Sequence, residues 1–161
     1  MSSKTAYFHL PGLFEFYELY KVFLPIFREH REYFYDWCDI GSIYGSPMDC
    51  IWSGGRVEVG EAETWKVLNL MQEYGISARL TFSNSLLKEE HLSDKICNDI
   101  CSLFAQNKSK KNNQTQSNIQ NTSMESCGAQ NQKIINSYVS NGVIVHSELL
   151  LNYLKNNYPE L

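Results

Sequence analysis

Polar side chains suited to binding or acid–base chemistry follow three short apolar runs of this 161-residue chain. Ser83 and Asn84 follow the run at residues 76–82, while His146 and Ser147 follow residues 143–145. Two glycines and an arginine come after a third run, at residues 50–52. Because parallel α/β folds bind ligands beyond the carboxyl ends of their strands, we predict one shared ligand-binding face. The candidate residues are Trp52, Gly54, Gly55, Arg56, Ser83, Asn84, His146 and Ser147.

The chemistry of these candidates is that of recognition more than of covalent catalysis. The Arg56 guanidinium can hold a carboxylate or a phosphate, and the His146 imidazole can act as a base. Asn84 can orient a carbonyl group. The alternative interpretation is that polar residues simply end strands, with Ser83 and Ser147 acting as helix N-caps and the glycines forming a tight turn. Since no Ser/His/Asp or Cys/His set has local support, no catalytic residue is assigned.

A second group with ligand-type chemistry lies at His91, Asp94, Cys97 and Cys101. Spacings of three, three and four place these residues near one face of a helix, which is one way to hold a metal ion. However, the two cysteines flank an apolar stripe, and buried thiols are common in protein cores. We therefore expect core cysteines, and we predict neither a metal nor a cofactor.

The elements that must position the candidates follow from the periodicity of apolar residues. Between Gly75 and Asn84, apolar and polar residues alternate with period two, which predicts a strand that follows one helix and precedes another. Comparable apolar runs bounded by turn residues predict three more strands. The predicted strands cover residues 5–10, 49–53, 76–83 and 143–145. The predicted helices that follow them cover residues 13–35, 61–74, 88–106 and 148–157.

Three segments fall outside these units. Residues 39–49 are rich in glycine and serine and are predicted to form a loop. Residues 107–132 are dominated by Asn, Gln and Ser, which predicts a disordered insertion because too little apolar surface is present to offset the entropy of ordering. Residues 134–139 suggest a short helix. Pro25 is expected to kink or divide the first helix.

Four consecutive βα units predict an α/β fold with parallel strands and right-handed crossovers. A complete (β/α)₈ barrel needs about 250 residues, so we predict a partial, half TIM-like barrel within a single domain at residues 5–161. Its two unpaired outer strands are expected to attract a partner.

Composition places the chain among ordinary globular proteins, with 43% hydrophobic residues and a net charge of −4. The acidic balance makes nucleic-acid binding an unfavoured function, and no apolar run is long enough to span a membrane. The first residues lack the apolar core of a signal peptide, which favours a cytoplasmic location. Five irregularly spaced cysteines favour reduced thiols over a disulfide framework.

Four motifs, in the same order, resemble those of a known family. They are Leu10-Pro11-Gly12, residues 49–56 with their glycine pair and arginine, residues 79–86, and residues 142–161 ending Tyr158-Pro159-Glu160-Leu161. Together they are similar to the N-terminal half of the collagenase-like peptidases, a family of unknown catalytic type. The loop at residues 39–47 and the insertion depart from that family's pattern.

The resemblance implies a barrel of parallel strands and links to peptidase activity, tRNA base hydroxylation or quinone hydroxylation. The cysteines that hold an iron–sulfur cluster in several relatives lie in the half not represented here. Two hypotheses remain open. The chain is a hydrolase-type or ligand-binding half-barrel, or it is a truncated, non-catalytic protein that acts through a homodimer or a complementary barrel half.

Overall fold

The computed structural model describes residues 5–54, 63–107, 109–110 and 138–161. Four strands form one parallel sheet of order β1-β2-β3-β6, so the sheet follows the order of the chain. These strands are β1 (Ala6–Pro11), β2 (Cys38–Gly45), β3 (Ser77–Phe82) and β6 (Gly142–Val145). A separate antiparallel pair joins β4 (Ser109–Lys110) to β5 (Tyr138–Val139). The predicted α/β class with parallel strands is confirmed.

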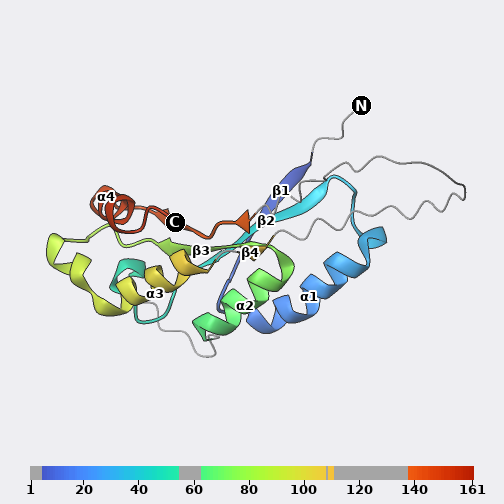
Figure 1. Ribbon diagram of the computed structural model, residues 1–161, viewed down its shortest axis with the longest axis horizontal. Helices are drawn as coiled ribbons and strands as arrows, with labels where there is room; N and C mark the ends of the chain where they lie inside the picture. Colours follow the sequence, from blue (N-terminus) through green and yellow to red (C-terminus); the bar gives the residue numbers. More distant parts are fainter. Residues whose placement is uncertain (1–4, 55–62, 108, 111–137) are drawn as a thin grey trace, which may run out of the picture.

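Helices separate the strands of the main sheet. The α-helices are α1 (Tyr17–Glu29), α2 (Thr64–Tyr74), α3 (Lys95–Gln106) and α4 (Glu148–Asn157), and the short 3₁₀ helices are η1 (Arg31–Tyr33), η2 (Ile51–Ser53) and η3 (Glu89–Ser93). Figure 1 shows α1, α2 and α3 on the same side of the sheet. All four α-helices contribute buried residues to one hydrophobic core, for example Leu24 of α1 and Leu150 of α4. Among the described residues, no helix is both long and apolar enough to cross a membrane.

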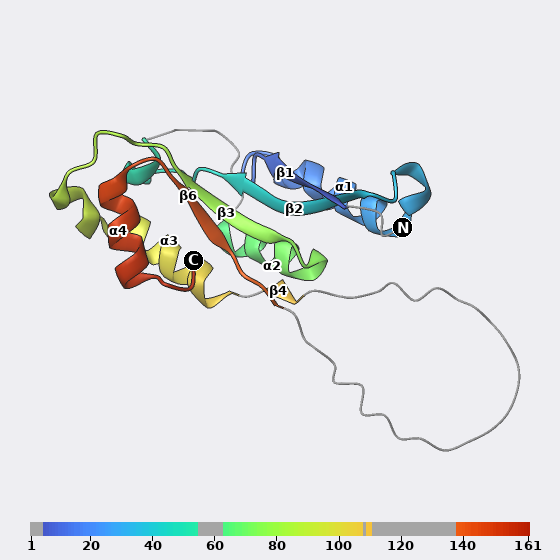
Figure 2. The same ribbon diagram turned by 90° about the horizontal axis from the view of Figure 1, so that it is seen from above.

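The two faces of the sheet differ because side chains alternate along each strand. In β3, Ala78, Leu80 and Phe82 are fully buried in the core under the helices. By this alternation the intervening residues point to the opposite side, which we call the open face. Figure 2 shows the strands of the sheet in the order β1, β2, β3 and β6. The open face carries His9, Ser42, Tyr44, Arg79, Thr81 and Ile144.

The second predicted strand is wrong. Residues 51–53 form the 3₁₀ helix η2, whereas β2 lies in the segment predicted to be a loop. The pairing of β1 with β2 is parallel but shifts register between Phe8 and His9, so that Gly41 is an extra residue on β2. This bulge interrupts the period-two pattern, and the glycines at both Gly41 and Gly45 resemble loop composition.

The thiol prediction is also wrong for two of the cysteines, because Cys50 and Cys97 form a disulfide that joins the segment before η2 to α3. Cys38 and Cys101 are free, and Cys101 is buried.

Helix boundaries agree best where a capping residue is present. The predicted helix at residues 148–157 is α4, and Ser147 caps it by accepting a hydrogen bond from the Leu150 N–H at 3.4 Å. The helix predicted at 88–106 is divided into η3 and α3, because Asp94 begins a new helix by accepting from the Cys97 N–H at 2.9 Å. Helix α1 begins at Tyr17 and continues through Pro25.

The predictions for the insertion are only partly covered by the structure. Residues 108 and 111–132 of the predicted disordered segment lie outside the described residues, as do residues 134–137 of the predicted short helix. The last two residues of that helix, Tyr138 and Val139, instead form strand β5. Beyond it, the buried Asn141 side chain donates to the carbonyl oxygens of Phe104 and Asn107 and accepts from the Ala78 N–H. Asn141 therefore holds the end of α3 against the starts of β3 and β6.

Candidate ligand-binding site

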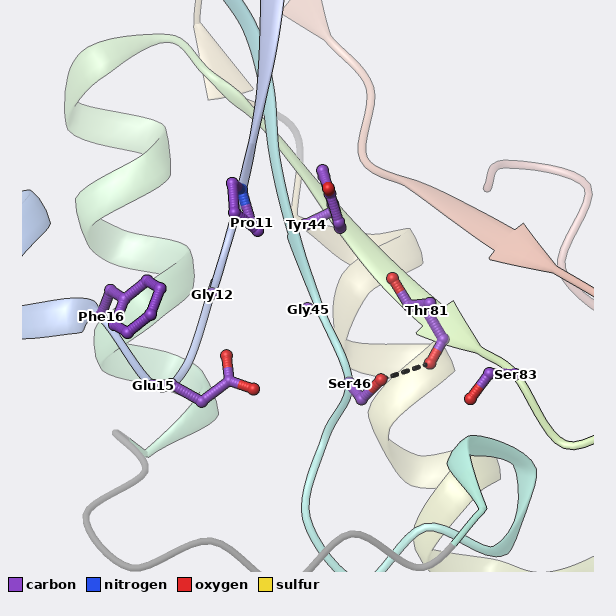
Figure 3. Close-up of a pocket in the computed structure, with 9 residues that line it drawn as sticks. All are labelled: Pro11, Gly12, Glu15, Phe16, Tyr44, Gly45, Ser46, Thr81 and Ser83. Carbon is purple, nitrogen blue, oxygen red and sulfur yellow. Dashed lines mark hydrogen bonds between the residues drawn. The ribbon is translucent and has the colours of Figure 1, made fainter.

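A cleft of about 440 Å³ lies at the carboxyl ends of β1, β2 and β3. We call it the mouth cleft. Figure 3 shows that the Glu15 carboxylate points from the turn after β1 toward β2, with Thr81 and Ser83 on the far side. The residues that line the cleft are Pro11, Gly12, Glu15, Phe16, Tyr44, Gly45, Ser46, Thr81 and Ser83. Parallel sheets commonly bind ligands at this position.

The polar atoms of the mouth cleft divide into paired and unpaired groups. The Ser46 hydroxyl donates to the Thr81 carbonyl at 3.1 Å, and the Ser83 hydroxyl donates to the Ser53 carbonyl at 3.1 Å. In contrast, Glu15 Oε2 and Thr81 Oγ1 are buried and have no hydrogen-bond partner in the described part of the chain. An ionised carboxylate oxygen only accepts, whereas a hydroxyl can donate or accept. The cleft therefore offers two oxygen atoms able to accept hydrogen bonds from a ligand.

Tyr20 of α1 supports the mouth cleft from behind, through the carbonyl of the lining residue Pro11. It is buried, and its hydroxyl donates to the Pro11 carbonyl at the end of β1. Burial raises the pKa of Tyr20 to about 12, and the nearby Glu15 and Tyr44 side chains add to this effect. At neutral pH the Tyr20 hydroxyl is therefore a protonated donor that fixes the β1 carbonyl beside Glu15.

A second cleft, of about 380 Å³, lies on the open face and is lined by His9, Ser42, Tyr44, Arg79 and Ile144. We call it the sheet cleft. Tyr44 lines both clefts, so they adjoin each other. A hydrogen bond of 2.7 Å joins His9 Nδ1 to the Ser42 hydroxyl. Arg79 Nε is buried without a partner among the residues that the structure describes.

Two of the predicted site residues have structural contacts instead of facing a cleft. Trp52 is fully buried; its indole N–H donates to the His91 carbonyl at 2.7 Å, and its ring meets Phe82 edge-on. The Asn84 amide donates to the Ile51 carbonyl at 2.8 Å, which holds η2 against the end of β3. These contacts keep the carboxyl end of the sheet in place.

The other predicted residues are dispersed. Ser83 lines the mouth cleft. Ser147 is the N-cap of α4 and His146 is exposed, so neither contributes to the lining of the two clefts. Gly54 ends η2 with a φ of 85°, a left-handed conformation that favours glycine. Gly55 and Arg56 lie outside the described residues, and the ligand-binding roles assigned to all eight residues stay predictions.

The residues considered for a metal have other partners. Asp94 caps α3, Cys97 is bonded to Cys50, and the His91 ring accepts from the Lys88 N–H at 3.1 Å. Burial raises the pKa of the Cys101 thiol to about 12. In the ranges that the structure covers, no group of three or more His, Cys, Asp or Glu side chains could hold a metal ion.

Sequence reasoning missed most of the residues that line the clefts. Arg79 and Thr81 are polar positions of the alternating run, but the predicted site lay at the end of that strand, at Ser83 and Asn84. Tyr44 was missed because β2 was predicted to be a loop. Glu15 stands in the turn before α1, where nothing in its neighbourhood separates it from an ordinary surface carboxylate.

Comparison with protein-family models, curated proteins and solved structures finds no match to this chain.

Proposed function

We propose that this chain is a ligand-binding half-barrel whose mouth cleft holds a small molecule by a hydrogen-bond-donating group, such as a primary ammonium. The observation that carries the proposal is the presence of two buried oxygens, Glu15 Oε2 and Thr81 Oγ1, without partners in the same cleft of the described structure. A buried polar atom without a partner costs about 1–3 kcal/mol, so its retention at a strand end favours a ligand that supplies the missing bond.

The charge of the cleft favours a cation over a neutral donor. Glu15 is an acceptor when ionised, and the lining residues Tyr44, Ser46, Thr81 and Ser83 contribute only hydroxyl groups beside it. An ammonium group carries three donors and a charge opposite to that of Glu15, and hydrogen bonds between ionised groups are roughly twice as strong as neutral ones.

The half-barrel part of the proposal rests on the order of the strands. Neighbouring strands of the sheet follow chain order and run parallel, as they do in each half of a (β/α)₈ barrel. The resemblance to the collagenase-like peptidases adds support from three of its four motifs, since residues 51–53 of the second motif form η2 instead of a strand. A hydrolase-type activity would place its substrate in the mouth cleft, but no nucleophile is assigned to it.

The test uses propylammonium and its neutral counterpart 1-propanol as probes, with binding followed by amide chemical-shift changes in NMR titrations. We expect propylammonium to shift the amides around the mouth cleft and to bind at least tenfold more tightly than 1-propanol. Glu15→Gln should remove that preference, and Thr81→Val should weaken propylammonium binding several-fold. The matched control is Glu18→Gln, since Glu18 is an exposed carboxylate on α1 paired with Lys21.

Equal binding of propylammonium by wild type and Glu15→Gln would overturn the proposal. If Glu15→Gln itself unfolds, the 1-propanol comparison on the wild-type chain still decides whether the cleft prefers a cation.

A second candidate function, pairing with another copy of the chain, is favoured by the edges of the sheet. Within the described residues, β1 pairs only with β2 and β6 pairs only with β3. Unpaired edges present a row of free N–H and C=O groups that can bind another strand. Light scattering behind size exclusion tests this function: a dimer supports it, and a stable monomer at high concentration contradicts it.

A further inference from the structure

A glycine lies beside each of the two basic side chains of the sheet cleft, Gly41 beside His9 and Gly142 beside Arg79. A Cβ added to Gly41 would lie 2.9 Å from His9 Cε1, closer than real Cβ atoms approach. A Cβ added to Gly142 would lie 3.5 Å from Arg79 Nη1, in ordinary contact. Gly41 is also the extra residue of the bulge, and bulges often redirect a side chain beside a binding site. The His9 and Arg79 side chains thus each lie beside a glycine of the neighbouring strand.

Arg79 gives the sheet cleft its charge. Of the five side chains that line this cleft, the Arg79 guanidinium is the one that is charged at every ordinary pH. No salt bridge joins it to a carboxylate among the described residues, and its Nε is buried without a partner there. A planar guanidinium pairs with a carboxylate through two parallel hydrogen bonds. A single positive charge also matches the single negative charge of a carboxylate better than a phosphate dianion.

Three buried side-chain atoms have no hydrogen-bond partner among the described residues, and all three belong to the two adjoining clefts. Glu15 Oε2 and Thr81 Oγ1 belong to the mouth cleft, Arg79 Nε belongs to the sheet cleft, and Tyr44 lines both. Glu15 follows β1 and Arg79 lies on β3, and these strands are separated by β2. Two inter-strand spacings amount to about 10 Å across the sheet. The Arg79 guanidinium lies beside Gly142 of β6, on the side of β3 away from β2, so a ligand that joins the two ends must be extended.

We infer that the ligand is a small aminocarboxylate, with its ammonium group at Glu15 in the mouth cleft and its carboxylate at Arg79 in the sheet cleft. This inference rests on the proposed function and deepens it. His9, Ser42 and Tyr44 supply hydrogen-bonding groups around the carboxylate end. The ligand then passes over the Tyr44 ring, which separates the acceptor end of the surface from its donor end.

The experiment compares four ω-amino acids of increasing length, namely glycine, β-alanine, 4-aminobutyrate and 6-aminohexanoate, with propylammonium. Binding is measured by NMR titration on the full chain. We expect at least one amino acid to bind tenfold or more tightly than propylammonium, with an optimum chain length. Arg79→Met should remove that advantage, so that the best amino acid binds no more tightly than propylammonium. The matched control is Arg28→Met, because Arg28 is an exposed arginine of α1.

A second variant keeps Arg79 and fills the space beside its guanidinium. Gly142→Val places methyl groups beside the guanidinium and should weaken the best amino acid at least fivefold without affecting propylammonium. This variant decides the question if Arg79→Met is too unstable to measure.

The outcomes separate the two proposals. Propylammonium binding that depends on Glu15 but gains nothing from an added carboxylate would overturn this inference and leave the proposed function standing. If the wild-type chain binds neither propylammonium nor any of the amino acids, both proposals are overturned. Tighter binding of 2-aminoethyl phosphate than of every amino acid would overturn the carboxylate assignment.

Discussion

The two faces of the parallel sheet are made by alternate residues of the same strands, yet the environments of their side chains differ. On the helix face, Leu80 and Phe82 are fully buried in the common core. On the open face, Arg79 and Thr81 each retain a buried polar atom without a partner in the described structure. Parallel sheets usually have both faces covered by other elements. The comparison teaches that the apolar contacts of the sheet are concentrated on the helix face, while buried polar atoms without partners lie on the open face, where the proposed binding site is.

The largest effect should follow from a cavity on the helix face. We expect Phe82→Ala to destabilise the fold by about 3–5 kcal/mol, because the large ring is fully enclosed and contacts Trp52. Its neighbour on the open face gives the opposite expectation: Thr81→Val removes a buried hydroxyl that has no partner and should raise stability by about 1–3 kcal/mol. Urea unfolding measures both, and equal losses would contradict the division between the faces.

A smaller effect is expected at the amino end of the sheet. Asn141→Ala leaves the Ala78 N–H and the carbonyls of Phe104 and Asn107 without their partner, at a cost of roughly 2–3 kcal/mol. The same urea experiment provides the measurement. Asn157→Ala is the control, because its exposed amide donates only to the Tyr153 carbonyl and should matter little. A loss as small as that of the control would show that Asn141 is not a structural link.

The smallest of the three effects concerns Tyr20 of α1, whose hydroxyl donates to the carbonyl of Pro11 beside the mouth cleft. Its pKa is about 12 in the folded chain and ordinarily near 10, so the unfolded chain loses the proton first. Stability is therefore retained below pH 10 and is lost as pH rises toward 12, by on the order of 2 kcal/mol. Cys101, with its pKa raised to about 12 by burial, adds a loss of the same sign that begins near pH 9.

Tyr20→Phe tests the contribution of this hydroxyl. Urea unfolding between pH 8 and pH 11.5 should show a flatter decline for the variant than for wild type, at a modest cost near pH 8 from the lost bond to the Pro11 carbonyl. Parallel curves would assign the alkaline loss to other groups.

The elements that the sequence predicted well are those in which one local signal is strong. Strict alternation identified β3, and a serine before an apolar stripe identified α4 to the residue. Strand β2 was hidden because its bulge breaks the alternation and its glycines serve packing: a Cβ at Gly45 would lie 2.8 Å from the Leu13 nitrogen. Such a constraint is invisible until the neighbouring strand is known.

The candidate site was predictable only in part, for a related reason. Residues after the strands were expected to form it, and Ser83 does line the mouth cleft. Most of the lining, however, comes from side chains within the strands, such as Tyr44 and Arg79, which become neighbours through strand pairing. Glu15 lines the cleft because the path of the turn after β1 directs its side chain toward β2. No pattern of residue types in the sequence predicts the path of that turn.

The extra residue at Gly41 changes which face of the sheet every later side chain of β2 occupies. Counting in twos from Asp39 would place Ile43 on the open face and Tyr44 in the core, whereas the bulge resets the count so that Ser42 stands opposite His9 and Tyr44 opposite Pro11. A deletion within a strand normally turns every later side chain over. Here the deletion of Gly41 would make Ile40 and Ser42 consecutive, opposite Phe8 and His9, and would restore a regular ladder. The later residues of β2 would keep their faces and their partners on β1. The deletion would therefore alter only the space around His9.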